Sequence, residues 1–171
     1  MRPLFSVESL FTRLLRTAYS GETQRVRFLS GISSRMDSEA LPGALEEISG
    51  EKDLHLRRLE LIAERHGIPL TEKGAQGMRA LIEEAEDRIL NEEDALLLDL
   101  ALADFLEKSA HDLGATYRSA RALSSARDWR QAKALLEANL EDEEKRSIEV
   151  VRWRRSRIRS LSDNPRTLAR R

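Results

Sequence analysis

Apolar residues recur along most of the chain at intervals of three and four, which is the spacing of one face of an α-helix. Glycines, prolines and helix-capping residues interrupt this pattern and divide the chain into five segments. No segment alternates apolar and polar residues as a half-buried strand does. The pattern therefore predicts an all-α fold of four long helices and one shorter helix.

The ends of the first three predicted helices follow from residues with known preferences at helix ends. The first helix is expected to start after the N-cap Ser6 and to run to about Gly31. The second should end where Gly67 can adopt a left-handed conformation and Pro69 prevents continuation. The shorter third helix is predicted over Thr71–Leu90, with its first residue as the cap.

The last two predicted helices are the longest. Asn91 is expected to cap the fourth helix and Asp128 to cap the fifth, which extends from Trp129 to about Ser160. Because the short third helix lies between the second and the fourth, those two helices should be joined by a long crossover. Together the five segments predict an antiparallel four-helix bundle with a short fifth helix in the crossover.

Composition agrees with this architecture and limits the domain count. The chain has 171 residues, of which 35% are charged and only 5% aromatic, as is typical of long amphipathic helices. This length suits one domain, which we place at residues 1–161. The basic segment 162–171 is predicted to be a disordered tail.

Several functional classes are disfavoured by composition and motifs. There is no cysteine, which excludes disulfides, thiolate nucleophiles and cysteine-ligated metals. A glycine-rich phosphate loop is absent, so no organic cofactor is expected. The net charge of −1 gives little support to a nucleic-acid partner, and the arginines near the C-terminus are interpreted as a solvated helix end.

The expected compartment is the cytoplasm. No run of 18 apolar residues is present, so no membrane span is predicted. Residues 1–15 carry three charges and no cleavage-site pattern, which disfavours a signal peptide.

Two polar residues lie on the apolar face of the second predicted helix. Ile48, Leu59 and Ile62 form this face, with His55 at its centre and Glu51 at its edge. Buried carboxylate and imidazole groups need partners. The two residues are therefore either a hydrogen-bonded pair one turn apart or half of a metal site inside the bundle.

Two further glutamates lie on apolar faces. Glu22 falls between Ala18 and Leu29 on the face of the first helix, where it is either a ligand or the partner of Arg25 at a helix edge. Glu143 lies within the apolar face of the last helix.

The fourth helix offers no comparable pair on its main face. Glu107 and His111 repeat the spacing of Glu51 and His55, but they point away from the main apolar face and are interpreted as surface residues. A second apolar side gives modest support for a homodimer, because an exposed apolar strip favours burial. It consists of Leu97, Leu100 and Ala101.

Several segments resemble the YciE/YciF family of ferritin-like proteins over about residues 5–160. Residues 18–24 (AYSGETQ) resemble its YSAEKQ-type segment, and residues 78–85 (MRALIEEA) resemble its M-x-G-L-I-x-E-A helix. Glu51 followed by His55 resembles the E-T-x-x-H segment, and residues 140–143 resemble L-x-E-E.

This resemblance implies a small cytoplasmic, stress-associated bundle that forms dimers and carries a dinuclear carboxylate site. Carried over residue by residue, the ligands of iron or another divalent metal would be Glu22, Glu51, His55 and Glu143.

Departures from the family pattern affect this site. The motif E-H-Y-E-I-A-x-Y stands here as residues 110–117, with Ala110 and Leu113 in place of both glutamates, and Ile48 replaces a histidine. Since a dinuclear site normally takes a glutamate from every helix, we expect a partial metal site. Ferroxidase activity is left open. The alternative is a metal-free bundle that acts as a dimeric interaction protein.

Overall fold

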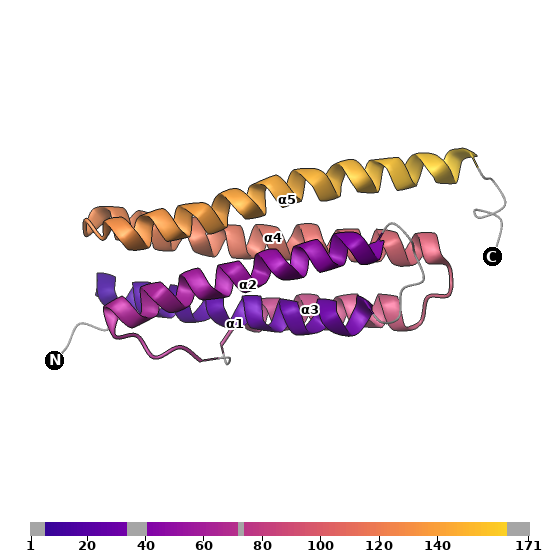
Figure 1. The fold of residues 1–171 in the computed structure, drawn as a ribbon. Coiled ribbons are helices and arrows are strands. Elements are labelled where there is room, and N and C mark those ends of the chain that lie inside the picture. Colours follow the sequence, from indigo (N-terminus) through magenta and orange to yellow (C-terminus); the bar gives the residue numbers. More distant parts are fainter. Residues whose placement is uncertain (1–5, 34–40, 72–73, 164–171) are drawn as a thin grey trace.

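Five α-helices form the described part of the chain in the computed structural model (Figure 1). The description leaves out residues 1–5, 34–40, 72–73 and 164–171, and also the side chains of residues 33–49 and 160–163. The helices are α1 (Val7–Ser33), α2 (Leu41–His66), α3 (Gln76–Leu90), α4 (Ala95–Ala126) and α5 (Arg130–Asp163). The described residues contain no strand, so the all-α prediction is confirmed.

The four long helices lie side by side, and α3 lies within the connection between α2 and α4 (Figure 1). The pairs α1–α2 and α4–α5 are each antiparallel, whereas α2 and α4 run in the same direction. Helix α3 runs opposite to both α2 and α4, and it packs against α1 and α4. The expected long crossover is thus present.

Two predicted helix ends are found where the capping residues place them. The backbone N–H of Ser9 donates to Ser6 Oγ at 3.1 Å, so Ser6 caps α1. Gly67 follows α2 with φ 61°, a conformation that costs a glycine little.

Three predicted caps are wrong. Asp94, not Asn91, caps α4: its carboxylate accepts from the backbone N–H of Leu96 and Leu97 at 2.9 and 3.1 Å. The third helix begins at Gln76 rather than after Thr71.

Asp128 does not cap the fifth helix as predicted. It takes the positive φ of 52° in the tight turn before α5. Its carboxylate accepts a hydrogen bond from the Arg130 side chain at 3.0 Å. Asp128 is therefore a residue of the turn and not the N-cap of α5.

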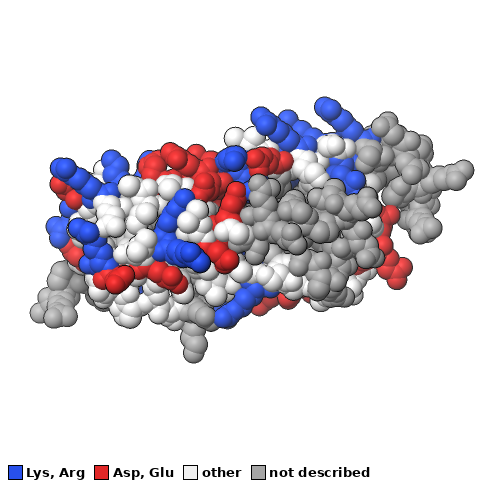
Figure 2. Space-filling view, viewed as in Figure 1, with Lys and Arg blue, Asp and Glu red and all other residues white. Residues whose placement is uncertain are grey.

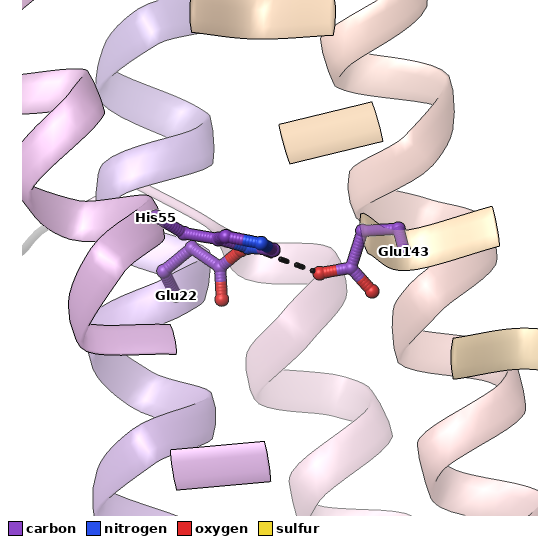
Figure 3. Close-up of side chains that lie close together, drawn as sticks. All are labelled: Glu22, His55 and Glu143. Atoms are coloured by element: carbon purple, nitrogen blue, oxygen red, sulfur yellow. Dashed lines mark hydrogen bonds and ion pairs between the residues drawn. The ribbon is translucent and has the colours of Figure 1, made fainter. Parts of the chain in front are cut away.

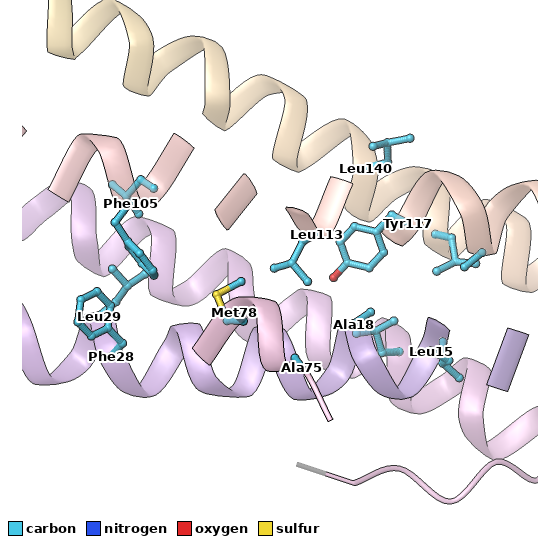
Figure 4. Close-up of a cluster of buried hydrophobic side chains, with 14 of the residues drawn as sticks. Leu15, Ala18, Phe28, Leu29, Ala75, Met78, Phe105, Leu113, Tyr117 and Leu140 are labelled. Carbon is cyan, nitrogen blue, oxygen red and sulfur yellow. The ribbon is translucent and has the colours of Figure 1, made fainter. Parts of the chain in front are cut away.

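The predicted apolar faces meet in one hydrophobic core (Figure 4). On α1 the apolar face is buried except for Leu14, which is half-buried, and Val7, which is 37% exposed. Leu59 and Ile62 of α2 are buried as predicted, while Ile48 and Leu161 lie outside the described side chains. The core residues labelled in Figure 4 include Leu15, Ala18, Phe28, Leu29, Met78, Phe105, Leu113, Tyr117 and Leu140.

The surface of the described residues is charged and mixed in sign. Acidic and basic side chains are interspersed over the face in Figure 2. Among the described residues, no helix has an apolar stretch long enough to cross a bilayer.

Candidate functional site

Three of the four predicted ligands converge in the interior of the bundle. Glu22 of α1, His55 of α2 and Glu143 of α5 are each at most 1% exposed. They offer ligand atoms that all lie within 4.8 Å of one another. In Figure 3 the His55 ring lies beside the Glu22 carboxylate, and a dashed line joins it to Glu143.

Glu51, the fourth predicted ligand, is not part of this group. Its carboxylate accepts two hydrogen bonds from the Arg146 guanidinium, at 2.6 and 3.2 Å, at the partly exposed boundary between α2 and α5. Glu51 lies four residues before His55, about 40° away around the helix, at the edge of the apolar face, and there its carboxylate meets Arg146 instead of the interior group.

Glu22 is held by three donors from three helices. Arg25, one turn further along α1, donates to Oε2 at 2.8 Å. The Tyr117 hydroxyl of α4 donates to Oε1 at 2.7 Å, and His55 Nδ1 lies 2.9 Å from the same oxygen. The Glu22–Arg25 pair considered from the sequence therefore exists, but in the core and not at a helix edge.

Two buried cations lie among the three acidic and imidazole side chains. The guanidinium of Arg25 donates from both Nη atoms to the two oxygens of Glu143, in addition to its bond with Glu22. The ammonium of Lys52 donates to Glu143 Oε1 and lies 3.5 Å from His55 Nδ1. Arg25 is 2% exposed and Lys52 1%, so neither charge is solvated by bulk water.

Both ring nitrogens of His55 face carboxylates. Nδ1 lies 2.9 Å from Glu22 Oε1, and Nε2 lies 3.3 Å from Oδ2 of Asp142, which in turn pairs with Arg58. Burial lowers the pKa of His55, but hydrogen bonds with Glu143 and Glu22 outweigh it and raise the pKa above its ordinary value. The arrangement therefore favours the protonated imidazole, which has no lone pair for a metal.

The charges of the two glutamates are fixed by the cations. Burial raises the pKa of Glu22, but the nearby charges of Arg25 and Lys52 overcome this effect and lower it to about 2. The same balance holds the pKa of Glu143 well below its usual range. Both carboxylates are consequently ionised at neutral pH.

Burial lowers the pKa of both cations, but the net shifts of Arg25 and Lys52 have opposite signs. Burial lowers the pKa of Arg25, yet Glu143 and Glu22 raise it above the ordinary value, so the guanidinium stays charged. Burial, followed by repulsion from Arg25, lowers the pKa of Lys52 despite attraction to both glutamates. Arg25 thus holds its positive charge beside the glutamates more firmly than Lys52 does.

Helix α4 contributes a hydroxyl, but no carboxylate, to the group. Ala110 and Leu113, where the family resemblance implies glutamates, are 5% and 1% exposed. A Cβ on Gly21, just before Glu22, would lie 3.0 Å from Leu113 Cδ2, so this leucine packs tightly against α1. Beside Ala110, a groove lined in part by Gly114 reaches Glu143.

These residues do not fit a dinuclear carboxylate centre. Two metal ions need oxygen donors from all four helices, whereas the group has two glutamates and one imidazole. The two negative charges of Glu22 and Glu143 are already balanced by Arg25 and Lys52, and a protonated His55 adds a further positive charge. A further divalent cation would place an uncompensated charge in the interior.

The sequence reasoning missed Lys52, although a signal was available. Lys52, His55, Leu59 and Ile62 are spaced three, four and three apart, which places this lysine on the same apolar face. It also missed the buried Asp99, whose carboxylate pairs with Arg157 of α5.

The second Glu–His pair is confirmed to lie outside the group. His111 is exposed on α4. Glu107 pairs with Arg154 at the partly exposed boundary with α5.

Comparisons with known proteins give consistent matches over most of the chain. The model of a family described as "Domain of unknown function (DUF892)" matches residues 6–151. Protein YciF of Escherichia coli K12 is 26% identical over 160 residues, covering 93% of this chain and 96% of that protein.

Two solved structures share the fold. The crystal structure of the E. coli stress protein YciF matches with a TM-score of 0.84 at 26% identity, covering 93% of this chain and 99% of that one. YcfI, described as a putative structural protein from Rhodopseudomonas palustris, matches with a TM-score of 0.80 at 21% identity, over 87% and 95% of the two chains. The second likeness concerns the fold alone.

Proposed function

Since the chain belongs to the DUF892 family, as its resemblance to the YciE/YciF proteins predicted, we propose that it is a stress-associated structural protein and not an iron oxidase. In this proposal the chain is a ferritin-like bundle that acts through its surface as a cytoplasmic homodimer. Its interior is a polar network held together by charge pairs and does not catalyse a reaction.

The helix order supports the ferritin-like part of the proposal. Two antiparallel pairs, α1–α2 and α4–α5, are joined by a connection that runs back along the bundle through α3. This is the connectivity of ferritin-like bundles, in which one long crossover links two helix pairs.

The single observation that carries the proposed function is the lack of a carboxylate ligand on α4. Ala110 and Leu113 stand in place of carboxylates, and Tyr117 instead donates a hydrogen bond to Glu22. A ferroxidase needs metal ions with open coordination positions and oxygen-rich ligands that offset their charge. A bundle whose fourth helix offers hydroxyls but no carboxylate at this depth lacks that chemistry.

The descriptions of the matched proteins support a structural role under stress. E. coli YciF is described as a stress protein, and the R. palustris protein as a putative structural protein. We extend both descriptions to this chain as a proposal.

The dimer is proposed from the resemblance and from one apolar strip on α4. Leu97 is 43% exposed, and its neighbours Leu100 and Ala101 are half-buried. Burial of this strip against a second copy would remove apolar surface from water. A dimer mass in light scattering supports this part, and a monomer mass at micromolar concentration rejects it.

A second candidate function is weak binding of a single metal ion. The close approach of Glu22, His55 and Glu143 favours it, because their three ligand atoms are near enough to share one ion. This alternative needs a neutral His55, so metal affinity would fall at acid pH.

An iron oxidation assay separates the structural protein from the oxidase. Purified protein is mixed anaerobically with ferrous iron, oxygen is added, and the rate of ferric iron formation is followed by absorbance. We expect the rate of the protein-free control. Faster oxidation that is lost in Glu143→Gln, but kept in the surface variant Glu144→Gln, would reject the proposed function.

A further inference from the structure

Arg25 and Lys52 lie where the family resemblance places metal ions, between Glu22 and Glu143. We infer that these two side chains act as built-in counter-cations that take over the electrostatic role of the metal and exclude divalent cations from the group. This inference deepens the proposed function, on which it rests, by naming the residues that keep the bundle metal-free.

The charges of the interior group are balanced without a metal ion. Within hydrogen-bonding distance of one another lie two carboxylates, one guanidinium and one ammonium, all at most 2% exposed. Buried charges persist when each is paired and hydrogen-bonded. The carboxylates therefore need no metal for their neutralisation.

The carboxylate oxygens that could bind a metal ion already accept hydrogen bonds. Both oxygens of Glu143 accept from Arg25, and one also accepts from Lys52. Both oxygens of Glu22 have donors, Arg25 on one and Tyr117 on the other. A metal ion would have to displace these donors.

The two cations come from different helices. Arg25 comes from α1 and Lys52 from α2, while the glutamates come from α1 and α5. The pairs therefore tie α5 to both α1 and α2 across the interior, which is the mechanical role that shared metal ligands have in a ferritin-like bundle. In the family segment E-T-x-x-H, which the stretch from Glu51 to His55 resembles, Lys52 stands in place of threonine.

Removal of the cations should therefore create a metal site. We would titrate Zn²⁺ and Mn²⁺ into the wild type and the double variant Arg25→Met/Lys52→Thr, and measure binding by calorimetry and the thermal midpoint of unfolding. Arg58→Met is the matched control, since Arg58 is a nearby cation that pairs with Asp142 and contacts neither glutamate of the group.

We expect no binding by the wild type or the control, and one ion per chain in the double variant. Its affinity should exceed that of the wild type by at least about tenfold, and metal should raise its thermal midpoint because the ion binds only the folded state. Adding His55→Gln to the double variant should abolish the gain.

Two results would overturn the inference. One is a wild type that binds metal through His55 as tightly as the double variant. The other is a double variant that is helical by circular dichroism yet gains no affinity. If the double variant folds only when metal is added, the inference is supported.

If the double variant does not fold under either condition, the single variant Lys52→Thr decides. A gain in its affinity supports the inference, and an unchanged affinity contradicts it. If the variants gain no affinity and the wild type oxidises no iron, the inference fails but the proposed function stands. If the wild type oxidises iron, the proposed function is rejected whatever the variants show.

Discussion

Arg25 of α1 and Glu143 of α5, separated by 118 residues in the sequence, form a bidentate ion pair in the interior of the bundle. Arg25 also bonds to Glu22, and Lys52 completes the contacts of Glu143. Such networks are costly to break from one side, because the remaining partner becomes an unpaired buried charge. This expectation gives the first prediction.

Replacement of Arg25 by methionine should destabilise the folded state by about 3–5 kcal/mol, because two buried carboxylates lose their principal partner. Urea unfolding followed by circular dichroism measures the loss. The control is Arg118→Met, which breaks the exposed pair with Glu144 and should cost about 1 kcal/mol or less. Similar losses in the two variants would mean that the buried network does not hold the helices together.

Acid should destabilise the protein through the ionised glutamates. The pKa of Glu22 is about 2 in the folded protein against a usual value of 4.5, so the folded state holds this proton less tightly than the unfolded state. The corresponding stability, on the order of 3 kcal/mol, is fully present above pH 4.5 and is lost as the pH falls through the folded pKa.

This effect can be assigned to one residue by comparison with Glu22→Gln. Urea unfolding energies measured at pH 7 and at pH 3 should differ less in the variant than in the wild type. An equal difference in both proteins would show that Glu22 does not titrate as described.

Tyr117→Phe should cost about 1–3 kcal/mol, since it removes the hydroxyl that donates to the buried Glu22 at 2.7 Å. It should also raise the pKa of Glu22, and thus move acid unfolding to higher pH, because a hydrogen bond to the charged form is lost. Tyr19→Phe is the control, as its hydroxyl contacts the exposed Glu60 at 3.3 Å. An acid transition shifted equally by both substitutions would argue against the specific bond.

Two helical glycines should respond differently to alanine. Gly114→Ala should stabilise the protein by up to about 1 kcal/mol, because alanine favours a helix and its Cβ would meet Arg118 and Leu140 at ordinary distances of 3.6 and 3.7 Å. Gly21→Ala should gain less or lose stability, because its Cβ would lie 3.0 Å from Leu113. Thermal unfolding of the two variants tests this contrast, and a larger gain at Gly21 would contradict the packing described.

The helices and most of the core could be predicted because each apolar face is encoded within one segment. Glu22, His55 and Glu143 were recognisable for the same reason, as polar residues on apolar faces. Glu51 was included from its position at the edge of the apolar face and from a family motif, but the structure pairs it with Arg146.

The pairing of the interior charges could not be read from any one helix. Arg25 was considered only as a partner of Glu22, because the sequence does not show that α5 brings Glu143 against it. Lys52 was overlooked although its spacing to His55 and Leu59 places it on the buried face. The nature of the site depends on these tertiary contacts, because the same two glutamates could either ligate a metal ion or form ion pairs with Arg25 and Lys52.

The central claim is that Arg25 and Lys52, and no metal ion, neutralise the interior glutamates. Crystals of the wild type soaked in Zn²⁺ or Mn²⁺, with anomalous diffraction data collected at the absorption edge of the metal, test it most directly. The account predicts no anomalous peak among Glu22, His55 and Glu143, and Arg25 and Lys52 in contact with the carboxylates. A peak about 2.0–2.2 Å from these ligand atoms, with either cation displaced, would contradict it.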